Sequence, residues 1–264
     1  MSKRFSSVEK ITLAAMLLAI SVALGTISKF IQIPHLSFLT FSFTPTIVVF
    51  ASLCLGPLYG AIVGGLADLL PAFFYPTGAY NFLLTIVFIL LGIIPWCLEK
   101  MTKLIRGKIN FLPLVIVFIL GILALEIYFF YGTDLLDKRL AYFGEYIKVI
   151  FIVLSVFMDS LAIVGIVFSE RYYLKRNDDF EGLPLPSEIS FISIINEVTL
   201  LVFFKGLAYY LYFIVISSTA YRVDYWVIVS MLFIGAPLDV LLMNVCIPWM
   251  LIFVKKHHYT HEKD

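Results

Sequence analysis

A small set of polar side chains interrupts long apolar stretches of this sequence, and these groups are the ones whose chemistry could support a function. The set consists of three asparagines, five acids and one lysine: Asn81, Asn196, Asn244, Asp68, Glu126, Asp159, Glu197, Asp239 and Lys205. An ionisable group in apolar surroundings is costly unless it has a partner or faces a cavity. The sequence therefore predicts that these residues point into the interior of the fold.

Lys205 is the one cation in the middle of an apolar run, FFKGLAYYLYF. Tyr209 and Tyr212 follow it at helical spacing and share roughly its face. Two interpretations remain open for its charge. It pairs with an internal carboxylate, or it anchors an anionic solute; the candidate carboxylates are those of Asp68, Glu126, Asp159 and Asp239.

No arrangement of residues predicts catalysis. Three of the four histidines, His257, His258 and His261, lie in the C-terminal tail, and the fourth, His35, lies in the segment IQIPHLSF. A Ser-His-Asp site, a histidine-bound metal or a HExxH helix would need a histidine inside an apolar run. No P-loop is present either. We therefore expect no enzyme, no cofactor and no metal site, with His35 either a solvated loop residue or part of a lid over a ligand.

The elements that position these groups must be transmembrane helices. The chain has 264 residues, 61% hydrophobic and only 14% charged, with a mean hydropathy of +1.00. So few charges cannot cover the exterior of a soluble domain of this size. The formal net charge of +1 gives no reason to expect a nucleic-acid partner. The predicted fold class is an all-α integral membrane protein in contact with the lipid bilayer.

Eight apolar runs are candidate membrane crossings, because a hydrocarbon core of about 30 Å needs roughly 20 apolar residues in a helix. They span about 11–31, 40–55, 57–75, 79–98, 111–131, 147–168, 193–217 and 226–254. Gly56-Pro57 separates the second from the third, either as a tight turn between two short crossings or as a break in one bent crossing. We treat residues 1–264 as a single membrane domain.

Basic residues cluster in every second connection, if the tight turn is left aside. Because Lys and Arg are enriched in cytoplasmic loops, this pattern predicts that both termini are cytoplasmic. The basic segments contain Lys3, Arg4, Lys10, Lys100, Lys103, Arg106, Lys108, Arg171, Lys175, Arg176, Lys255, Lys256 and Lys263.

Small residues form two stripes. Gly56, Gly60 and Gly64 recur every four residues in GPLYGAIVGGLAD, with Asp68 next in register, and Ala15-x-x-x-Ala19 lies in the first run. Such stripes permit close approach of helices, and many of them only pack inside a bundle.

The segment from Leu36 to Tyr80 resembles the substrate-binding S components of energy-coupling factor (ECF) vitamin transporters, the folate-type members most closely. The matching features are Ser42-Phe43, Pro45, Gly56-Pro57 with Gly60, Val63-Gly64 with Asp68, and Phe74, Pro76, Gly78 and Tyr80. The opening KITLAAMLLAI also resembles the first helix of that family. The resemblance covers residues 8–98. The chain departs from the folate-type outer loop, since Asn81-Phe82-Leu83-Leu84-Thr85 replaces P-G-F-T.

The resemblance implies a six-helix core, so that residues 111–170 form an extra helical hairpin and residues 193–254 supply the last two helices. It also implies capture of a water-soluble vitamin, for example folate or pantothenate, and delivery with a transmembrane coupling subunit and two ABC-type ATPases. Ala15 and Ala19 would contact the coupling subunit. The expected binding residues are Tyr80, Asn81, Lys205, Tyr209 and Trp226, with His35 in a lid. The alternative is a stand-alone, proton-coupled secondary transporter that uses Glu126, Asp159 and Lys205 as a relay.

Overall fold

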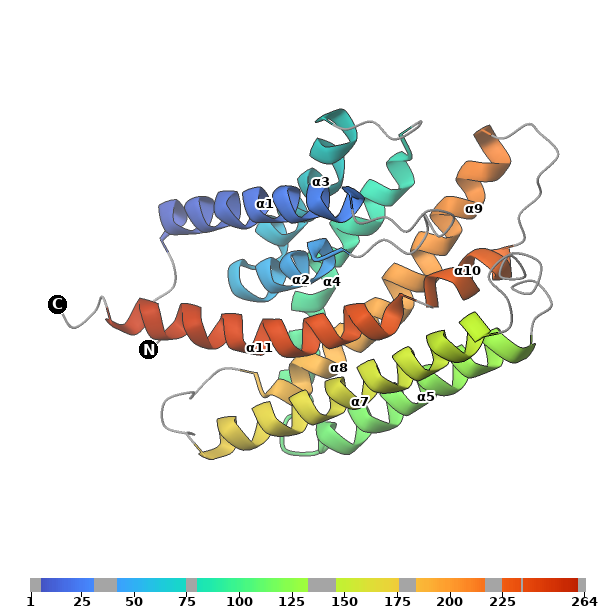
Figure 1. Ribbon diagram of the computed structural model, residues 1–264. Helices are drawn as coiled ribbons and strands as arrows, with labels where there is room; N and C mark the ends of the chain where they lie inside the picture. The colour runs from blue at the N-terminus through green and yellow to red at the C-terminus, as the bar shows by residue number, and fades with distance from the viewer. Residues whose placement is uncertain are drawn as a thin grey trace.

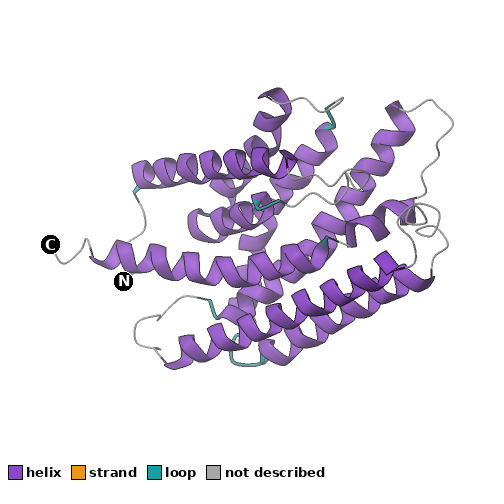
Figure 2. Cartoon of the chain, in the orientation of Figure 1, coloured by secondary structure: helices purple, strands orange, loops and turns teal. Residues whose placement is uncertain are grey.

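The computed structural model describes residues 6–30, 42–74, 80–132, 146–175, 184–216, 225–233 and 235–260, and helices account for nearly all of them (Figures 1 and 2). The helices are α1 (Ser7–Phe30), α2 (Thr44–Leu55), α3 (Pro57–Phe74), α4 (Phe82–Ile105), α5 (Phe111–Gly132), α7 (Tyr146–Lys175), α8 (Pro186–Asn196), the π-helix η3 (Glu197–Phe204), α9 (Lys205–Ile216), α10 (Tyr225–Phe233) and α11 (Ala236–Thr260).

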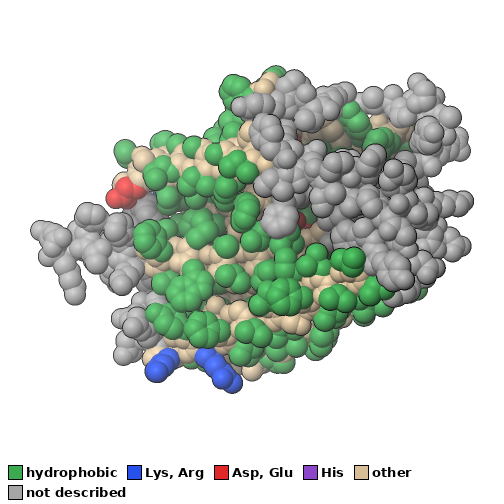
Figure 3. Space-filling view, in the orientation of Figure 1, with side chains coloured by type: hydrophobic (Ala, Val, Ile, Leu, Met, Phe, Trp, Pro, Cys, Tyr) green, Lys and Arg blue, Asp and Glu red, His purple; other side chains and the backbone are tan. Residues whose placement is uncertain are grey.

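Seven helical segments in the described part of the chain are long and apolar enough to cross a membrane, and α2 is a shorter apolar helix. Large hydrophobic side chains such as Phe73, Leu120 and Val164 are exposed on the outside of the bundle. Figure 3 shows one such face, on which hydrophobic side chains dominate the described helices and the basic side chains in view gather at one end. The prediction of a polytopic all-α membrane bundle is confirmed.

A continuous helical rod of α8, η3 and α9 forms the most buried of the seven spans. It begins at Pro186, seven residues before the predicted start at 193. Its neighbours come from both halves of the chain, because α4, α5, α7, α10 and α11 all pack against some part of it. Polar residues of this rod are therefore held away from lipid.

The break between α2 and α3 is a tight reversal. Gly56 has a φ of 97°, a left-handed conformation that glycine adopts at little cost, and Pro57 begins α3. Residues equidistant from the turn lie together, since a Cβ atom added to Gly60 would meet Ser52 and one added to Gly64 would meet Val48. The two helices thus form an antiparallel pair, which favours the tight-turn alternative.

Glycines bring α3 and α4 into close contact. A Cβ atom on Gly60 would overlap the carbonyl oxygen of Gly92, and a Cβ atom on Gly92 would overlap that of Gly60. One turn away, a Cβ atom on Gly64 would overlap the carbonyl oxygen of Phe88. The glycine stripe therefore packs internally, against the following helix.

The last predicted crossing, 226–254, is two helices, α10 and α11. Pro237 occupies the second position of α11, where its missing N–H removes no helical hydrogen bond. Because proline disfavours helical geometry at the preceding residue, Ala236-Pro237 starts a helix more readily than it continues one.

Helices α5 and α7 pack against each other at the side of the bundle (Figure 1). Their buried contact joins Ile119 and Ile122 to Ala162, and the same apolar cluster includes Ile194 of α8 and Val240 of α11. The segment predicted to be an extra hairpin is thus attached to the central rod and to the last helix.

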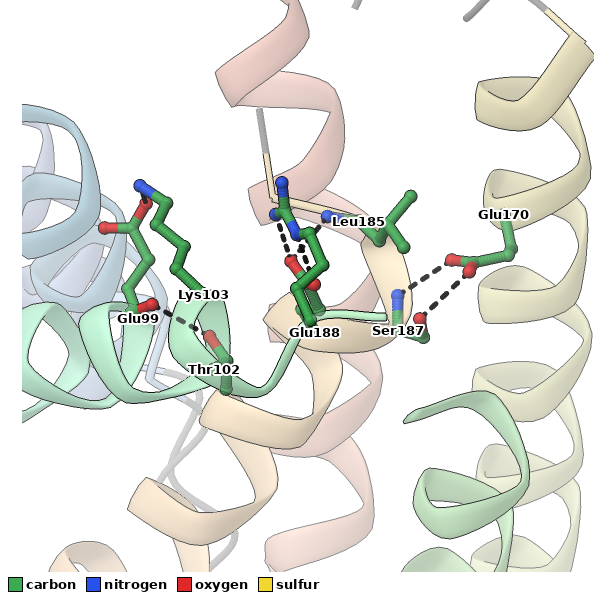
Figure 4. A network of polar contacts seen from close by, with 8 residues as sticks. Glu99, Thr102, Lys103, Glu170, Leu185, Ser187 and Glu188 are labelled. Atoms are coloured by element: carbon green, nitrogen blue, oxygen red, sulfur yellow. Dashed lines mark hydrogen bonds and ion pairs between the residues drawn. The ribbon is translucent and has the colours of Figure 1, made fainter. Parts of the chain in front are cut away.

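Polar contacts join three helix ends at one end of the bundle (Figure 4). Arg106, which follows α4, binds the buried Glu188 of α8 through both carboxylate oxygens, with an Nε–Oε1 distance of 2.7 Å. The hydrogen bond to Glu188 raises the pKa of the Arg106 guanidinium. Glu170 of α7 accepts hydrogen bonds from the backbone N–H of Ser187 at 2.9 Å and from its hydroxyl at 3.0 Å. We call this network the end clamp.

Candidate substrate-binding site

Asn81 joins the start of α4 to α9. Its Oδ1 atom accepts a hydrogen bond from the backbone N–H of Leu83 at 3.1 Å and caps α4. Its Nδ2 atom donates to the carbonyl oxygen of Ala208 at 3.1 Å. Both ends of this buried amide are therefore engaged by the backbone, so that Asn81 positions the two helices relative to each other.

Tyr80 is held by α3 and α4 together. Thr85 donates a hydrogen bond from its hydroxyl to Asp68 Oδ2 at 2.5 Å, and the Tyr80 hydroxyl is hydrogen-bonded to the same Thr85 oxygen. The ring of Tyr80 remains exposed. Asp68, the last residue in register with the glycine stripe, thus fixes the side chain that precedes the Asn81 cap.

Aromatic side chains of α9 and α10 pack against each other. Tyr209 follows Ala208 directly, and Lys205 lies one turn earlier on α9. The rings of Tyr210 and Tyr225 are 5.8 Å apart, and those of Tyr225 and Trp226 are 5.4 Å apart. Trp226 is more than half exposed. Such rings form a wall that suits a flat, apolar ligand surface.

Five of the six predicted binding residues thus lie on neighbouring elements, although they are separated by more than a hundred residues in the sequence. Tyr80 and Asn81 directly precede α4, Lys205 and Tyr209 belong to α9, and Trp226 belongs to α10. The sixth, His35, lies outside the described residues. We call the five residues the α4–α9–α10 site.

Lys205 lies among acidic groups of the bundle interior. Its ammonium group is close enough to interact electrostatically with both Glu197 of η3 and Asp239 of α11. Within the described ranges, no ion pair of 4 Å or less joins Lys205 to either acid. Asp239 is one of the four internal partners considered from the sequence, whereas Glu197 is an additional one.

Two buried serines of α8 were not among the candidate polar residues predicted from the sequence. Ser190 and Ser193 are fully buried, as are Asn196 on the same helix and Asn244 on α11. The spacing Ser-x-x-Ser-x-x-Asn-Glu within an otherwise apolar segment is the signal that could have revealed them, because it repeats at the period of a helix.

Glu126 of α5 and Asp159 of α7 form a separate acidic pair in the side hairpin. Both are buried and interact electrostatically with each other, and Ser155 lies beside Glu126. Their carboxylate oxygens have no hydrogen-bond partner in the described part of the structure.

Ala15 and Ala19, the predicted coupling contacts, lie on the exposed face of α1. Ala14 and Leu17 occupy the opposite, buried face. The small-residue stripe of α1 is therefore open to a neighbouring molecule or to lipid.

No group of three or more His, Cys, Asp or Glu residues within the described ranges has the geometry of a metal centre. Comparisons with known proteins add no identification: no protein-family model, no curated protein and no solved structure matches this chain.

Proposed function

We propose that this protein is the substrate-binding subunit of an ECF-type importer and captures a water-soluble vitamin. The observation that supports the proposal best is that the elements carrying the expected binding residues are neighbours: the Asn81–Ala208 hydrogen bond joins the start of α4 to α9, and the Tyr210–Tyr225 ring contact joins α9 to α10. An aromatic wall beside a few fixed polar groups is the usual composition of a small-molecule site. The resemblance of residues 8–98 to the S components supports the same proposal.

In this proposal the chain spans the cytoplasmic membrane with both termini in the cytoplasm. The basic residues of the end clamp and its surroundings then face the cytoplasm, as the enrichment of Lys and Arg in cytoplasmic loops favours. The protein has no enzymatic activity of its own. A transmembrane coupling subunit and two ABC-type ATPases supply the energy, and folate or pantothenate exemplify the ligand, since each combines polar groups with a carboxylate that Lys205 could meet.

Mass spectrometry of small molecules released from the purified protein tests this proposal. Protein expressed in rich medium should release a vitamin, and the same compound should raise the thermal unfolding temperature of protein purified empty. Trp226→Ala should reduce this ligand-dependent shift, whereas Trp249→Ala on α11 serves as a matched control. Reproducibly empty protein, with no shift across a panel of vitamins, would argue against the proposed function.

Bulky substitutions on α1 test the proposed coupling contact. Ala15→Trp and Ala19→Trp should abolish vitamin uptake by cells while leaving ligand binding by the purified protein intact, because both positions are exposed on α1. Ile20→Trp, at an exposed position on a different side of the same helix, shows whether bulk alone is sufficient. Unchanged uptake in both alanine variants would remove the docking role of this stripe.

A stand-alone, proton-coupled secondary transporter is the second candidate, and the buried pair of Glu126 and Asp159 favours it. Carboxyl groups inside membrane helices often carry protons in transporters. Uptake driven by a pH gradient into liposomes that contain this chain alone would support this candidate. Such uptake should then be lost in Glu126→Gln.

A further inference from the structure

Polar side chains line one face of the central rod where it meets α11. Ser190, Ser193 and Glu197 follow one another at intervals of three and four residues and therefore share a face of α8 and η3. Asn196 adjoins Glu197 at the junction between the two helices. A π-helix such as η3 is rare and frequently marks a functional site.

This face points toward α11. Ile189, at one edge of it, belongs to the same buried cluster as Met243 of α11. Ile194, at the other edge, belongs to the same buried cluster as Val240 of α11. Ser190 and Ser193 lie between these two isoleucines around the helix, so they face α11 as well.

Helix α11 contributes two polar residues to the contact. Asn244 follows Val240 by four residues and so lies on the same side of α11. Asp239 interacts electrostatically with Glu197. The polar groups of the two helices thus meet in the middle of the bundle. We call this set the polar seam; it contains Ser190, Ser193, Asn196, Glu197, Asp239 and Asn244.

The seam holds more oxygen atoms than the protein satisfies. Five buried oxygens and one buried amide nitrogen have no hydrogen-bond partner among the residues that the structure describes: Ser190 Oγ, Ser193 Oγ, Asn196 Oδ1, Glu197 Oε2, Asn244 Oδ1 and Asn244 Nδ2. Each of these residues is exposed by 2% or less. Because buried polar atoms in native proteins nearly always have a partner, the excess of unpaired oxygens over the one unpaired nitrogen on these two helices favours an occupant that interacts with oxygen.

The charges of the seam also favour an occupant, and one that carries a positive charge. Glu197 and Asp239 share the Lys205 ammonium as their nearby cation. When all three groups are ionised, one negative charge is left without compensation by the groups that the structure describes. An uncompensated charge in the interior of a membrane protein is strongly unfavourable, so a single additional positive charge would stabilise the cluster.

We propose that the polar seam binds one monovalent alkali cation, with Na⁺ as the ion to test. Carboxylate, amide and hydroxyl oxygens are the ligands that hard cations select, and a single positive charge matches the excess of the acids over Lys205. A proton on one carboxyl group would also remove the excess charge, so the response to Na⁺ must be separated from the response to pH. This proposal does not require a vitamin as ligand, although Lys205 belongs to the α4–α9–α10 site and is also the cation beside the seam.

Binding of ²²Na⁺ to the full-length protein in detergent tests the proposal. Wild-type protein should bind Na⁺ saturably with about one ion per chain, and NaCl should raise its unfolding temperature more than choline chloride does at equal ionic strength. Glu197→Gln should raise the Kd for Na⁺ about tenfold or more, because it removes a charged ligand. Ser193→Ala keeps the charges and the size of the core, so a folded protein with weaker Na⁺ binding is expected.

Glu126→Gln is the matched control, since it neutralises a buried, unpaired carboxyl group outside the seam and should leave Na⁺ binding unchanged. Three results would overturn the proposal. The first is an equal shift of the unfolding temperature of the wild-type protein by NaCl and by choline chloride. The second is an equal loss of Na⁺ binding in Glu126→Gln and Glu197→Gln. The third is stabilisation of the protein by acidic pH without any effect of Na⁺, which would indicate that the seam binds a proton only.

Discussion

Adding one methyl group at Gly92 is expected to destabilise this protein severely. The Cβ atom of alanine at this position would overlap the carbonyl oxygen and carbon of Gly60 and the backbone nitrogen of Ala61. Backbone atoms cannot rotate away as a side chain can, so α3 and α4 must separate. Overpacking of this kind typically costs about 1–3 kcal/mol, occasionally more, and Gly92→Leu is expected to prevent folding.

Gly121→Ala on α5 is the matched control for Gly92→Ala. Gly121 also lies inside a transmembrane helix, but its added Cβ atom would meet no described atom within 4 Å. Alanine also favours a helix over glycine by about 0.5–1 kcal/mol, so this control should be neutral or slightly stabilising. Thermal unfolding in detergent, followed by intrinsic fluorescence, compares the two. Equal unfolding temperatures would contradict the close crossing of α3 and α4.

The partner of the glycine stripe illustrates what one sequence can and cannot predict about this fold. The spacing of Gly56, Gly60 and Gly64 is visible in the sequence and indicates a smooth helical face. Gly92, which meets Gly60 across the contact, carries no such signal because it is an isolated glycine in a long apolar run. Hydropathy therefore located the helices, whereas the pairing of their faces depends on tertiary contacts.

The helix boundaries were also only partly predictable from the sequence. Hydrophobic runs predicted the segments well, but α8 begins seven residues earlier than predicted, in the sequence PSEIS. The polar residues of this sequence lower its mean hydropathy, so that it does not resemble part of an apolar run. In the structure they are buried because Glu188 and Ser187 bind Arg106 and Glu170. A polar segment with partners elsewhere in the chain resembles a loop when it is considered alone.

Prediction of the candidate site depended on the resemblance more than on the polar residues themselves. Tyr80 and Asn81 were selected from one segment and Tyr209 from another, and the Asn81–Ala208 hydrogen bond brings these segments together. The sequence predicted the acidic neighbours of Lys205 only in part. Asp239 was among its possible partners, but Glu197 lies on the same rod, and the π-helical geometry that places it near Lys205 has no known sequence signal here.

Arg106→Ala is expected to cost most of the stability that the end clamp provides. Glu188 is fully buried and, among the residues that the structure describes, would keep the hydrogen bond from the Leu185 backbone N–H, at 3.0 Å. Removing one member of a buried ion pair costs about 3–5 kcal/mol. Because the Arg106 side chain is 35% exposed, water can partly replace it, and we expect a loss of about 2–3 kcal/mol.

Two further variants separate the geometry of the clamp from its charge. Arg106→Lys keeps the positive charge but cannot bind both oxygens of Glu188 in the same plane, so its stability should lie between those of the wild type and Arg106→Ala. Lys103→Ala removes a more exposed cation, which pairs with Glu99 one turn away on α4. The Glu99 side chain is only 10% exposed, but Lys103 contacts one of its oxygens where Arg106 binds both oxygens of Glu188. We therefore expect a loss of about 1 kcal/mol, smaller than that of Arg106→Ala. Unfolding by heat in detergent should rank the variants in this order. A loss in Lys103→Ala as large as that in Arg106→Ala would mean that general charge at this end of the bundle, rather than the buried Glu188, determines the effect.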